Sequence, residues 1–448
     1  MKSKLKINNS RWPGICLKFG VFLLPFSADF GATALVFALF GLWKQQYHQI
    51  VAHRLNWTLG LLSLWLILTS IFAFKPIFSL EGLGNFLPCF LLLAAFPVFF
   101  YKVSRLYQLA WWLVLTSIPL CFLGLMQLIA GWESPLFLRV MGIKLIAYGN
   151  PDGRMSSLLM YANTLAFYLL ITFTLSIGLG IDTYRRWQQQ KNPQLNWQLG
   201  IIIIAILSNS MGLILTNSRS AWGLALLGLM AFAVYLRWYW VISGVIIAIL
   251  AVFWAAWGPF GQEMMRHLVP SYFWARLTDD LYSDRYVTAL RTTQWGVAWE
   301  MMLQRPWLGW GLRNFTPVYQ TEMNVWMGHP HNLFLMLLAE IGIPGTLLLS
   351  GIVGSILFQA VQLLRGWSEE QKLAKKQEEF RLYQRKERQY LLLFTYVVGF
   401  SLCIIFNCFD VSIFDVRVNL PGWILLAAIA GLIKGNGLIK STTQRPKV

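Results

Sequence analysis

Long apolar runs, separated by short polar segments, recur from one end of this chain to the other. Many of them have about 17–25 residues, the length that a helix needs to cross a hydrocarbon core of about 30 Å. The alternating segments of about 10 residues that build a membrane barrel do not occur. The pattern therefore predicts an all-α, polytopic membrane protein with about twelve transmembrane helices.

The first apolar stretch leaves open how many helices it forms. Four basic residues precede a run from Ile15 to Phe26. Phe26 stands where a signal-peptide cleavage site needs a small residue, so we expect an uncleaved span. Pro25 and Asp29 interrupt the run, which continues from Phe30 to Trp43. We predict two short helices joined by a turn on the outer side, with one long bent helix as the alternative.

The later spans divide the chain into four regions. We expect an N-terminal membrane region (1–196), a core (197–364) whose outer loop at 258–343 contains helices, a charged cytoplasmic loop (365–389), and C-terminal helices with a basic tail (390–448). The later spans are expected at Trp57–Phe74, Phe86–Tyr101, Leu109–Ala130, Ser157–Ile181, Trp197–Leu215, Ser220–Leu236, Tyr239–Trp257, Pro344–Leu364, Tyr390–Cys408 and Leu420–Ile433.

A net charge of +18 accompanies a chain that is 57% hydrophobic. Such a charge would also suit a nucleic-acid-binding protein, so its position along the chain decides its meaning. The segments assigned to the inside hold 24 Lys and Arg residues and those assigned to the outside hold 12, as the positive-inside rule requires. Topology thus accounts for the charge, with both termini in the cytoplasm and no nucleic acid as a partner. The run from Glu369 to Arg388 is interpreted as a solvated cytoplasmic helix.

The outer loop contains arginine but no lysine between Gly258 and Pro330. A guanidinium group binds phosphate oxygens in bidentate fashion and keeps its charge, whereas lysine is a mobile point charge. Six arginines without a lysine suggest recognition of a diphosphate. For most of these arginines, however, pairing with the six acidic residues of the same loop is the favoured interpretation.

Two arginines fit an anion-binding site best. Arg219 lies in TNSRSAW (216–222), where Asn217 or Ser218 can cap the helix that follows. Its cation then lies in a first helical turn, which the helix dipole disfavours unless an anion binds there. Arg291 lies on a helix expected from about Asp284 to Gln304, in a stripe that is otherwise apolar. It either extends to the membrane interface or points into a polar cavity.

His331 is the candidate general base. It belongs to the HPH sequence directly before the apolar run Leu333 to Ile341. Histidine can take a proton from an alcohol near neutral pH, although at a loop-to-helix junction it can also be a surface or capping residue. Pro330 and Asn332 leave room for a helix start at His331, which would place the ring at the membrane surface.

Metal chemistry and disulfides are not expected. His329 and His331 flank a proline, and no third ligand of suitable spacing follows them, so a zinc site is not predicted. All five cysteines lie in or at the edges of spans, and none lies in the outer loop. They form neither a disulfide framework nor a metal site. No cofactor is predicted.

Three motifs in order resemble the signature of the O-antigen ligase and O-antigen polymerase superfamily. They are TNSRSAW (216–222), Arg291-x-x-x-Trp295 leading into RPWLGWGLRNF (305–315), and HPHNLFLMLLAEIGIPG (329–345). The segment GRMSSLLMYANTLA (153–166) is also similar, though less specific. The resemblance covers about residues 197–364.

This resemblance implies a multi-span, GT-C-like glycosyltransferase of cell-envelope polysaccharide or lipopolysaccharide biosynthesis in the bacterial inner membrane. It implies an inverting, metal-independent transfer from a polyprenyl-diphosphate-linked glycan, with undecaprenyl diphosphate as the carrier, to a lipid or glycan acceptor on the periplasmic face. By the same resemblance, Arg219 and Arg291 grip the diphosphate and His331 deprotonates the acceptor hydroxyl. Supporting roles are expected for Arg154, His329, Asn332 and Trp295.

Two questions stay open at the level of sequence. A ligase moves a finished glycan once onto a different acceptor, whereas a polymerase joins two lipid-linked chains repeatedly; the form of the HPHN motif favours the ligase. The number of spans would also suit a transporter of inorganic carbon or another solute. Transporters usually carry ionisable residues at mid-membrane, and here Lys18 is the clearest charge inside a span.

Overall fold

The computed structural model describes residues 11–443, apart from residue 191, residue 276 and residues 279–286. The described residues form helices and connecting loops without a strand, as the hydropathy pattern predicts. Within the described part of the chain, ten helical segments are long and apolar enough to cross a membrane. They are Arg54–Ile71, Pro76–Val98, Val103–Ala130, Ala162–Gln190, Pro193–Leu215, Arg219–Leu236, Tyr239–Trp257, Leu333–Lys376, Phe380–Phe406 and Val416–Asn436.

The first apolar stretch forms two helices. Helix α1 (Trp12–Leu23) has only 12 residues, and α2 (Ala28–Val51) follows after a short turn. They pack closely as an antiparallel pair. Gly20 of α1 lies against Leu35, and Gly31 of α2 lies against Leu24, and a side chain at either glycine would collide with its neighbour. The expectation of two helices is confirmed, but neither is among the ten segments that meet the length and hydropathy criteria for a span.

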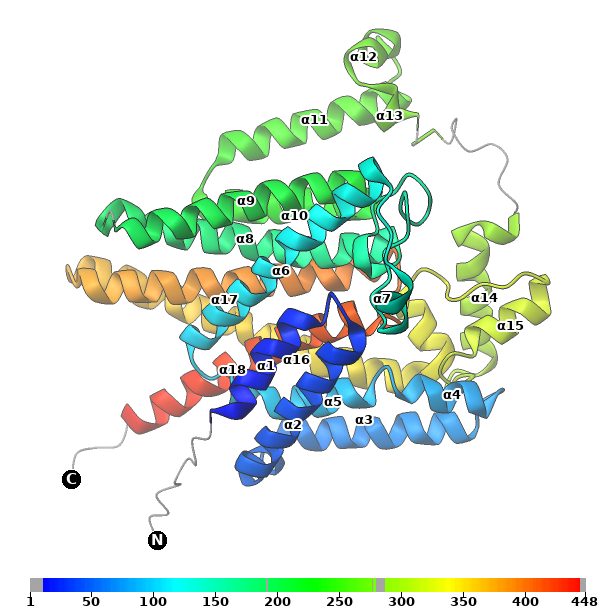
Figure 1. The fold of residues 1–448 in the computed structure, drawn as a ribbon, viewed down its shortest axis with the longest axis horizontal. Helices are drawn as coiled ribbons and strands as arrows, with labels where there is room; N and C mark the ends of the chain where they lie inside the picture. The colour runs from blue at the N-terminus through cyan, green and yellow to red at the C-terminus, as the bar shows by residue number, and fades with distance from the viewer. Residues whose placement is uncertain (1–10, 191, 276, 279–286, 444–448) are drawn as a thin grey trace.

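Helix α8 (Ala162–Gln190) lies at the centre of the bundle (Figure 1). In its most apolar stretch 78% of the residues are buried, against 11% in α11 (Tyr239–Trp257), which lies at the edge. A helix that is apolar all round needs neighbours on every side. Those neighbours are α6 (Val103–Ala130), α9 (Pro193–Leu215), α10 (Arg219–Leu236) and α17 (Phe380–Phe406).

Helix α16 (Leu333–Lys376) is broken near its start. Gly342 has φ 70° and ψ 176°, outside the helical region, and Pro344 follows it. The loop after α14 occupies the break: Ile343 N–H donates to Pro306 O over 2.8 Å, and Gly311 N–H donates to Glu340 O over 2.8 Å. The span expected from Pro344 therefore begins at Leu333, because Gly342 and Pro344 kink the helix and do not end it.

The segment between α11 and α16 contains helices, as expected for the outer loop. They are α12 (Gln262–Leu268), α13 (Ser271–Trp274), the short 3₁₀ turn η3 (Val287–Ala289), α14 (Arg291–Gln304) and α15 (Phe315–Met323). The helix expected from about Asp284 begins at Arg291, since Leu290 is extended; Asp284 itself lies outside the described residues. Figure 1 shows α14 and α15 at the same end of the bundle as α7 (Leu136–Val140).

The remaining helices and two 3₁₀ turns complete the bundle. Helices α3 (Arg54–Ile71), α4 (Pro76–Leu83) and α5 (Leu87–Ala95) with the turn η1 (Phe96–Val98) pack beside α16 and α18 (Val416–Thr443). A second 3₁₀ turn, η2 (Ser157–Leu159), precedes α8 and packs on α6. The start of α16, the end of α17 and the start of α18 thus meet at one end of the bundle.

Candidate functional site

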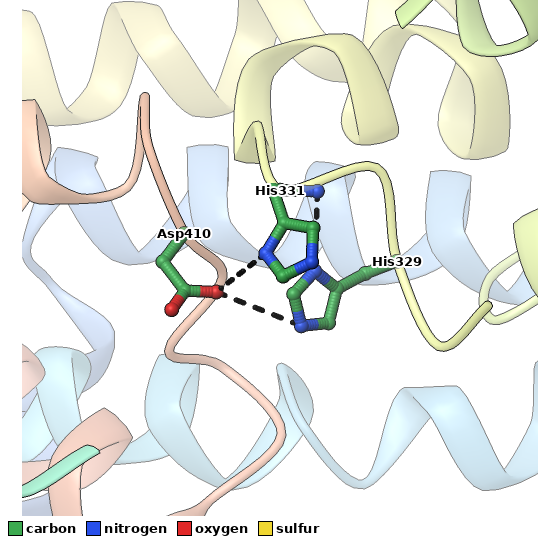
Figure 2. Close-up of side chains that lie close together, drawn as sticks. All are labelled: His329, His331 and Asp410. Carbon is green, nitrogen blue, oxygen red and sulfur yellow. Dashed lines mark hydrogen bonds and ion pairs between the residues drawn. The ribbon is translucent and has the colours of Figure 1, made fainter. Parts of the chain in front are cut away.

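The HPH loop before α16 lies against an aspartate from the loop between α17 and α18 (Figure 2). His331 Nδ1 is 3.1 Å from Asp410 Oδ1, and His329 Nε2 is 3.7 Å from the same oxygen. Asp410 follows His331 by 79 residues. The fold therefore builds a cluster of two imidazoles and one carboxylate from segments that are distant in sequence.

Local backbone contacts hold the HPH loop in place. Asn332 precedes α16, and its side-chain oxygen accepts hydrogen bonds from Phe334 N–H at 3.0 Å and Leu335 N–H at 3.1 Å. Leu333 N–H donates to Asn407 O, at the end of α17, over 2.8 Å. Asn332 is thus a helix cap, and α16 starts at Leu333, two residues after the start considered from the sequence.

Asp410 is itself buried and fully hydrogen-bonded. Its Oδ1 accepts from Val411 N–H at 2.9 Å, and its Oδ2 accepts from Asn163 Nδ2 at 2.8 Å. Burial acts to raise the pKa of Asp410, but the hydrogen bond with His331 and the neighbouring imidazoles outweigh it and leave the pKa below the ordinary value. Asp410 is therefore an ionised acceptor near neutral pH.

Arg154 connects this cluster to the motif that carries Arg219. Its Nη2 donates to Asn163 Oδ1 and its Nε donates to Thr216 O, each over 2.8 Å. Thr216 opens TNSRSAW, three residues before Arg219. The hydrogen bonds thus run from the C-terminal end of α9 through Arg154 and Asn163 to Asp410, and they fix these segments relative to one another.

Arg219 and Arg291 occupy equivalent positions. Each is the first residue of a helix, α10 and α14 respectively, and each is exposed. Ser218 stands at the cap position before Arg219, but its side chain makes no capping hydrogen bond, and its buried hydroxyl has no hydrogen-bond partner among the described residues. Both arginines therefore stand beside helix N-termini, where backbone N–H groups attract anions.

Helix α14 is attached directly to the HPH loop. Trp295, one turn after Arg291, donates from its indole Nε1 to Pro330 O over 3.0 Å. The charge of Arg291 also acts on the ring of His329. Arg291 is exposed, and its charge lies near enough to the HPH loop to act on His329. Trp295 accordingly anchors α14 at the site.

His329 is a neutral ring with a defined tautomer. Burial lowers its pKa to about 4, opposed by Asp410 and assisted by the charges of His331 and Arg291. His331 N–H donates to His329 Nδ1 over 3.2 Å. Because Nδ1 accepts this bond, the ring proton of neutral His329 is on Nε2, the nitrogen that faces Asp410.

The same cluster has the composition of a metal site. The ligand atoms of His329, His331 and Asp410 lie within 4.8 Å of one another, so the fold supplies a third ligand that the sequence spacing did not offer. A metal-bound imidazole nitrogen must be unprotonated, so coordination through His329 Nε2 would require that nitrogen to release its proton. The same three side chains can form a hydrogen-bonded acid–base cluster without a metal.

His331 can act as a base at its other nitrogen. Since Asp410 is ionised, the hydrogen between the two residues belongs to His331 Nδ1. The neutral ring then has its lone pair on Nε2. The side chain of His331 is 28% exposed, so a hydroxyl group can approach it. A base oriented by a carboxylate is the arrangement that many acyl- and glycosyl-transfer sites need.

Two residues of this cluster were missed by sequence reasoning. Asp410 belongs to none of the motifs, and no feature of the sequence assigned it a role. Asn163 lies in the GRMSSLLMYANTLA segment that carries part of the family resemblance. Through the hydrogen bonds of Asn163 to Arg154 and Asp410, this segment forms part of the cluster.

The described residues define an all-α membrane protein with a cluster of two imidazoles and one carboxylate at one end of its bundle. Residues 202–350 match the family model described as O-antigen ligase, and no curated protein matches the chain. This match relates residues 202–350 to an O-antigen ligase-related family and supports glycan transfer of the ligase or polymerase type in general. The matched segment contains Arg219, Arg291 and His331, whereas Asn163 and Asp410 lie outside it.

Proposed function

We propose that this protein transfers a glycan from a polyprenyl-diphosphate-linked donor to an acceptor hydroxyl, in the manner of an O-antigen ligase. The observation that carries the proposal is the 3.1 Å contact between His331 and Asp410, next to a segment that matches the O-antigen ligase family. We place the reaction on the periplasmic face of the bacterial inner membrane, with both termini in the cytoplasm. The distribution of basic residues supports this orientation.

In the proposed reaction His331 Nε2 takes the proton of the acceptor hydroxyl. The acceptor oxygen attacks the anomeric carbon of the donor sugar while the bond from that carbon to the diphosphate oxygen breaks. The polyprenyl diphosphate leaves with the bonding electron pair. A single displacement inverts the anomeric configuration. Asp410 is a positioning residue in this scheme, since it holds the His331 ring and stabilises the imidazolium that forms.

Arg219 and Arg291 bind the diphosphate in this proposal. The leaving group gains negative charge in the transition state, and guanidinium groups together with helix N-termini stabilise that charge without a metal. The position of Arg291 near His329, and the hydrogen bonds that link the Arg219 segment to Asp410, support a shared site. Arg154 and Asn163 hold the site together and do not contact substrate.

The metal-independent scheme has a direct test in the purified protein. Transfer should proceed at an unchanged rate in the presence of excess chelator, because the His329 tautomer leaves Nε2 protonated. Loss of activity that is restored by Zn²⁺ or another divalent cation would instead assign His329, His331 and Asp410 as ligands.

The experiment that tests the proposed function uses a defined donor. Purified protein is incubated with a polyprenyl-diphosphate oligosaccharide alone and then with added lipid acceptors. A single mobility shift that needs the second lipid supports the ligase reaction. A ladder of products from donor alone would assign polymerase activity, and no turnover of any donor or acceptor would refute glycan transfer.

A further inference from the structure

A basic cavity lies at the end of the bundle away from the His331–Asp410 cluster. Its volume is about 570 Å³, and it lies between the starts of α1 and α6, the second half of α2 and the end of α18. None of the described residues that line it is acidic. Five of them are basic: Arg11, Lys18, Lys102, Arg105 and Lys434.

The cavity lies about one membrane thickness from the proposed active site. Lys434 is on α18, which begins at Val416 close to Asp410. The 18 residues from Val416 to Lys434 span about 27 Å along a helix, close to the hydrocarbon thickness of about 30 Å. With the active site on the periplasmic face, this cavity is at the cytoplasmic boundary of the membrane.

A neighbouring cavity shows how cations in this part of the fold are normally neutralised. It shares Tyr101 and Lys102 with the first cavity, but it also contains two acidic residues. Asp182 pairs with Arg186 at 3.1 Å and with Arg388 at 3.2 Å. Glu387 pairs with Arg185 at 3.1 Å. Arg185, Arg186 and Arg388 of this cavity therefore have acidic partners within the chain.

The five cations of the first cavity have no such partners within it. Arg105 stacks on the Phe99 ring at 4.4 Å, and Lys434 Nζ donates to Gln49 O over 3.4 Å. These contacts leave the positive charge uncompensated. The described lining of the cavity therefore supplies no carboxylate for these five cations.

The position of Lys18 adds to the case for a bound anion. It lies in the middle of α1, a helix that is otherwise apolar, and it is half-buried. A charge in a membrane-embedded helix is unfavourable unless it meets a counter-charge or water. The cavity wall around Lys18 combines apolar side chains, such as Ile15 and Val98, with the cations. That mixture suits a molecule with an anionic head and an apolar tail.

We propose that this cavity binds the phosphate headgroup of an anionic phospholipid from the cytoplasmic leaflet. Phosphate oxygens match guanidinium and ammonium donors, and basic pockets between membrane helices on the cytoplasmic side bind such headgroups. The site would stabilise the packing of α1 and α2 against α6 and α18. Its assignment to the cytoplasmic leaflet rests on the orientation given in the proposed function, but the binding test does not depend on glycan transfer.

The test measures lipid binding to the full-length protein in detergent. Phosphatidylglycerol, zwitterionic phosphatidylcholine and inorganic phosphate are each titrated, and bound lipid is measured by native mass spectrometry. The double variant Lys18→Gln/Arg105→Gln is compared with Lys44→Gln, which removes an exposed cation of α2 that does not line the cavity. We expect phosphatidylglycerol to bind selectively, and each cavity cation removed to weaken its binding about fivefold, with no change in Lys44→Gln.

Three outcomes would overturn the proposal. The first is equal binding of phosphatidylglycerol and phosphatidylcholine to the wild-type protein. The second is equal loss of binding in Lys44→Gln and in the cavity variants. The third is displacement of the lipid by millimolar inorganic phosphate, which would make the cavity a site for free phosphate. If the double variant does not fold, Arg11→Gln replaces it, since Arg11 is exposed and precedes α1.

Discussion

Asp410 Oδ1 lies 3.1 Å from His331 Nδ1, although one residue precedes α16 and the other follows α17. The contact joins two loops at the same end of two long membrane helices. It fixes the tautomer of His331, because an ionised carboxylate can only accept the hydrogen bond. The lone pair is thereby left on Nε2, which is what a general base for an acceptor hydroxyl needs.

Replacing Asp410 by asparagine should slow transfer strongly while preserving the fold. The amide keeps the shape of the side chain and a bond to Asn163, but it removes the charge that fixes the His331 tautomer. We expect kcat to fall about 100-fold or more with little change in the KM for the donor. Steady-state kinetics on the purified variant measure both values.

The matched control for this variant is Asp415→Asn. Asp415 lies in the same loop, but it pairs with Arg417 at 2.6 Å and not with a histidine. It should retain the wild-type rate. Equal losses of kcat in the two variants would mean that Asp410 supports only the folding of the loop.

Arginine-to-lysine changes test diphosphate binding. Arg219→Lys and Arg291→Lys keep the charge but lose the bidentate fork. Loss of one charge-assisted hydrogen bond weakens the interaction by about 1.5–3 kcal/mol, so we expect kcat/KM for the donor to fall about 10- to 150-fold. Rates at limiting donor measure the effect.

An outer arginine with an acidic partner gives the control. Arg139 pairs with Glu133 at 2.8 Å and is remote in sequence from the family motifs. Arg139→Lys should leave kcat/KM unchanged. Full activity of both Arg219→Lys and Arg291→Lys would show that these two side chains have a structural role only.

The neutral state of His329 predicts how stability depends on pH. Its pKa in the folded protein is about 4, below the ordinary value of 6.5. Between these values the unfolded chain binds a proton that the folded chain does not, so stability falls as the pH drops from about 6.5 to about 4. The full effect of the shift is about 3 kcal/mol. Thermal unfolding in detergent at a series of pH values measures it.

His329→Asn should flatten this dependence, because the asparagine oxygen can still accept the hydrogen bond from His331 N–H but the side chain does not titrate. His267→Asn, in the exposed helix α12, is the control and should keep the wild-type slope. Identical slopes in all three proteins would contradict a buried neutral His329.

Hydropathy predicted the spans well where a helix is straight. The span Tyr239–Trp257 has the same bounds as α11, because apolar residues begin and end together with the helix. The prediction was wrong at Pro344, where a break stabilised by the loop at residues 306–311 keeps both parts of α16 in one element. No local pattern reveals such a break, since the stabilising contacts come from elsewhere in the chain.

The site was predictable only in part for a similar reason. His331, Arg219 and Arg291 lie in motifs that can be read along the chain. Asp410 has no periodic or spacing relationship to His331, and only the packing of α16, α17 and α18 brings the two together. Asn332 and Trp295 were expected to support the site, and the structure gives each a definite contact, with α16 and with Pro330.

The central claim is that His331 is the base for glycan transfer. The most direct measurement is single-turnover transfer from a polyprenyl-diphosphate oligosaccharide to a lipid acceptor by wild-type protein and by His331→Asn. The asparagine amide can replace Nδ1 in the bond to Asp410, so the loop should keep its structure, but Nε2 is lost. We predict that the variant binds donor normally and transfers about 100- to 10,000-fold more slowly. Transfer at the wild-type rate by a folded His331→Asn protein would contradict the account.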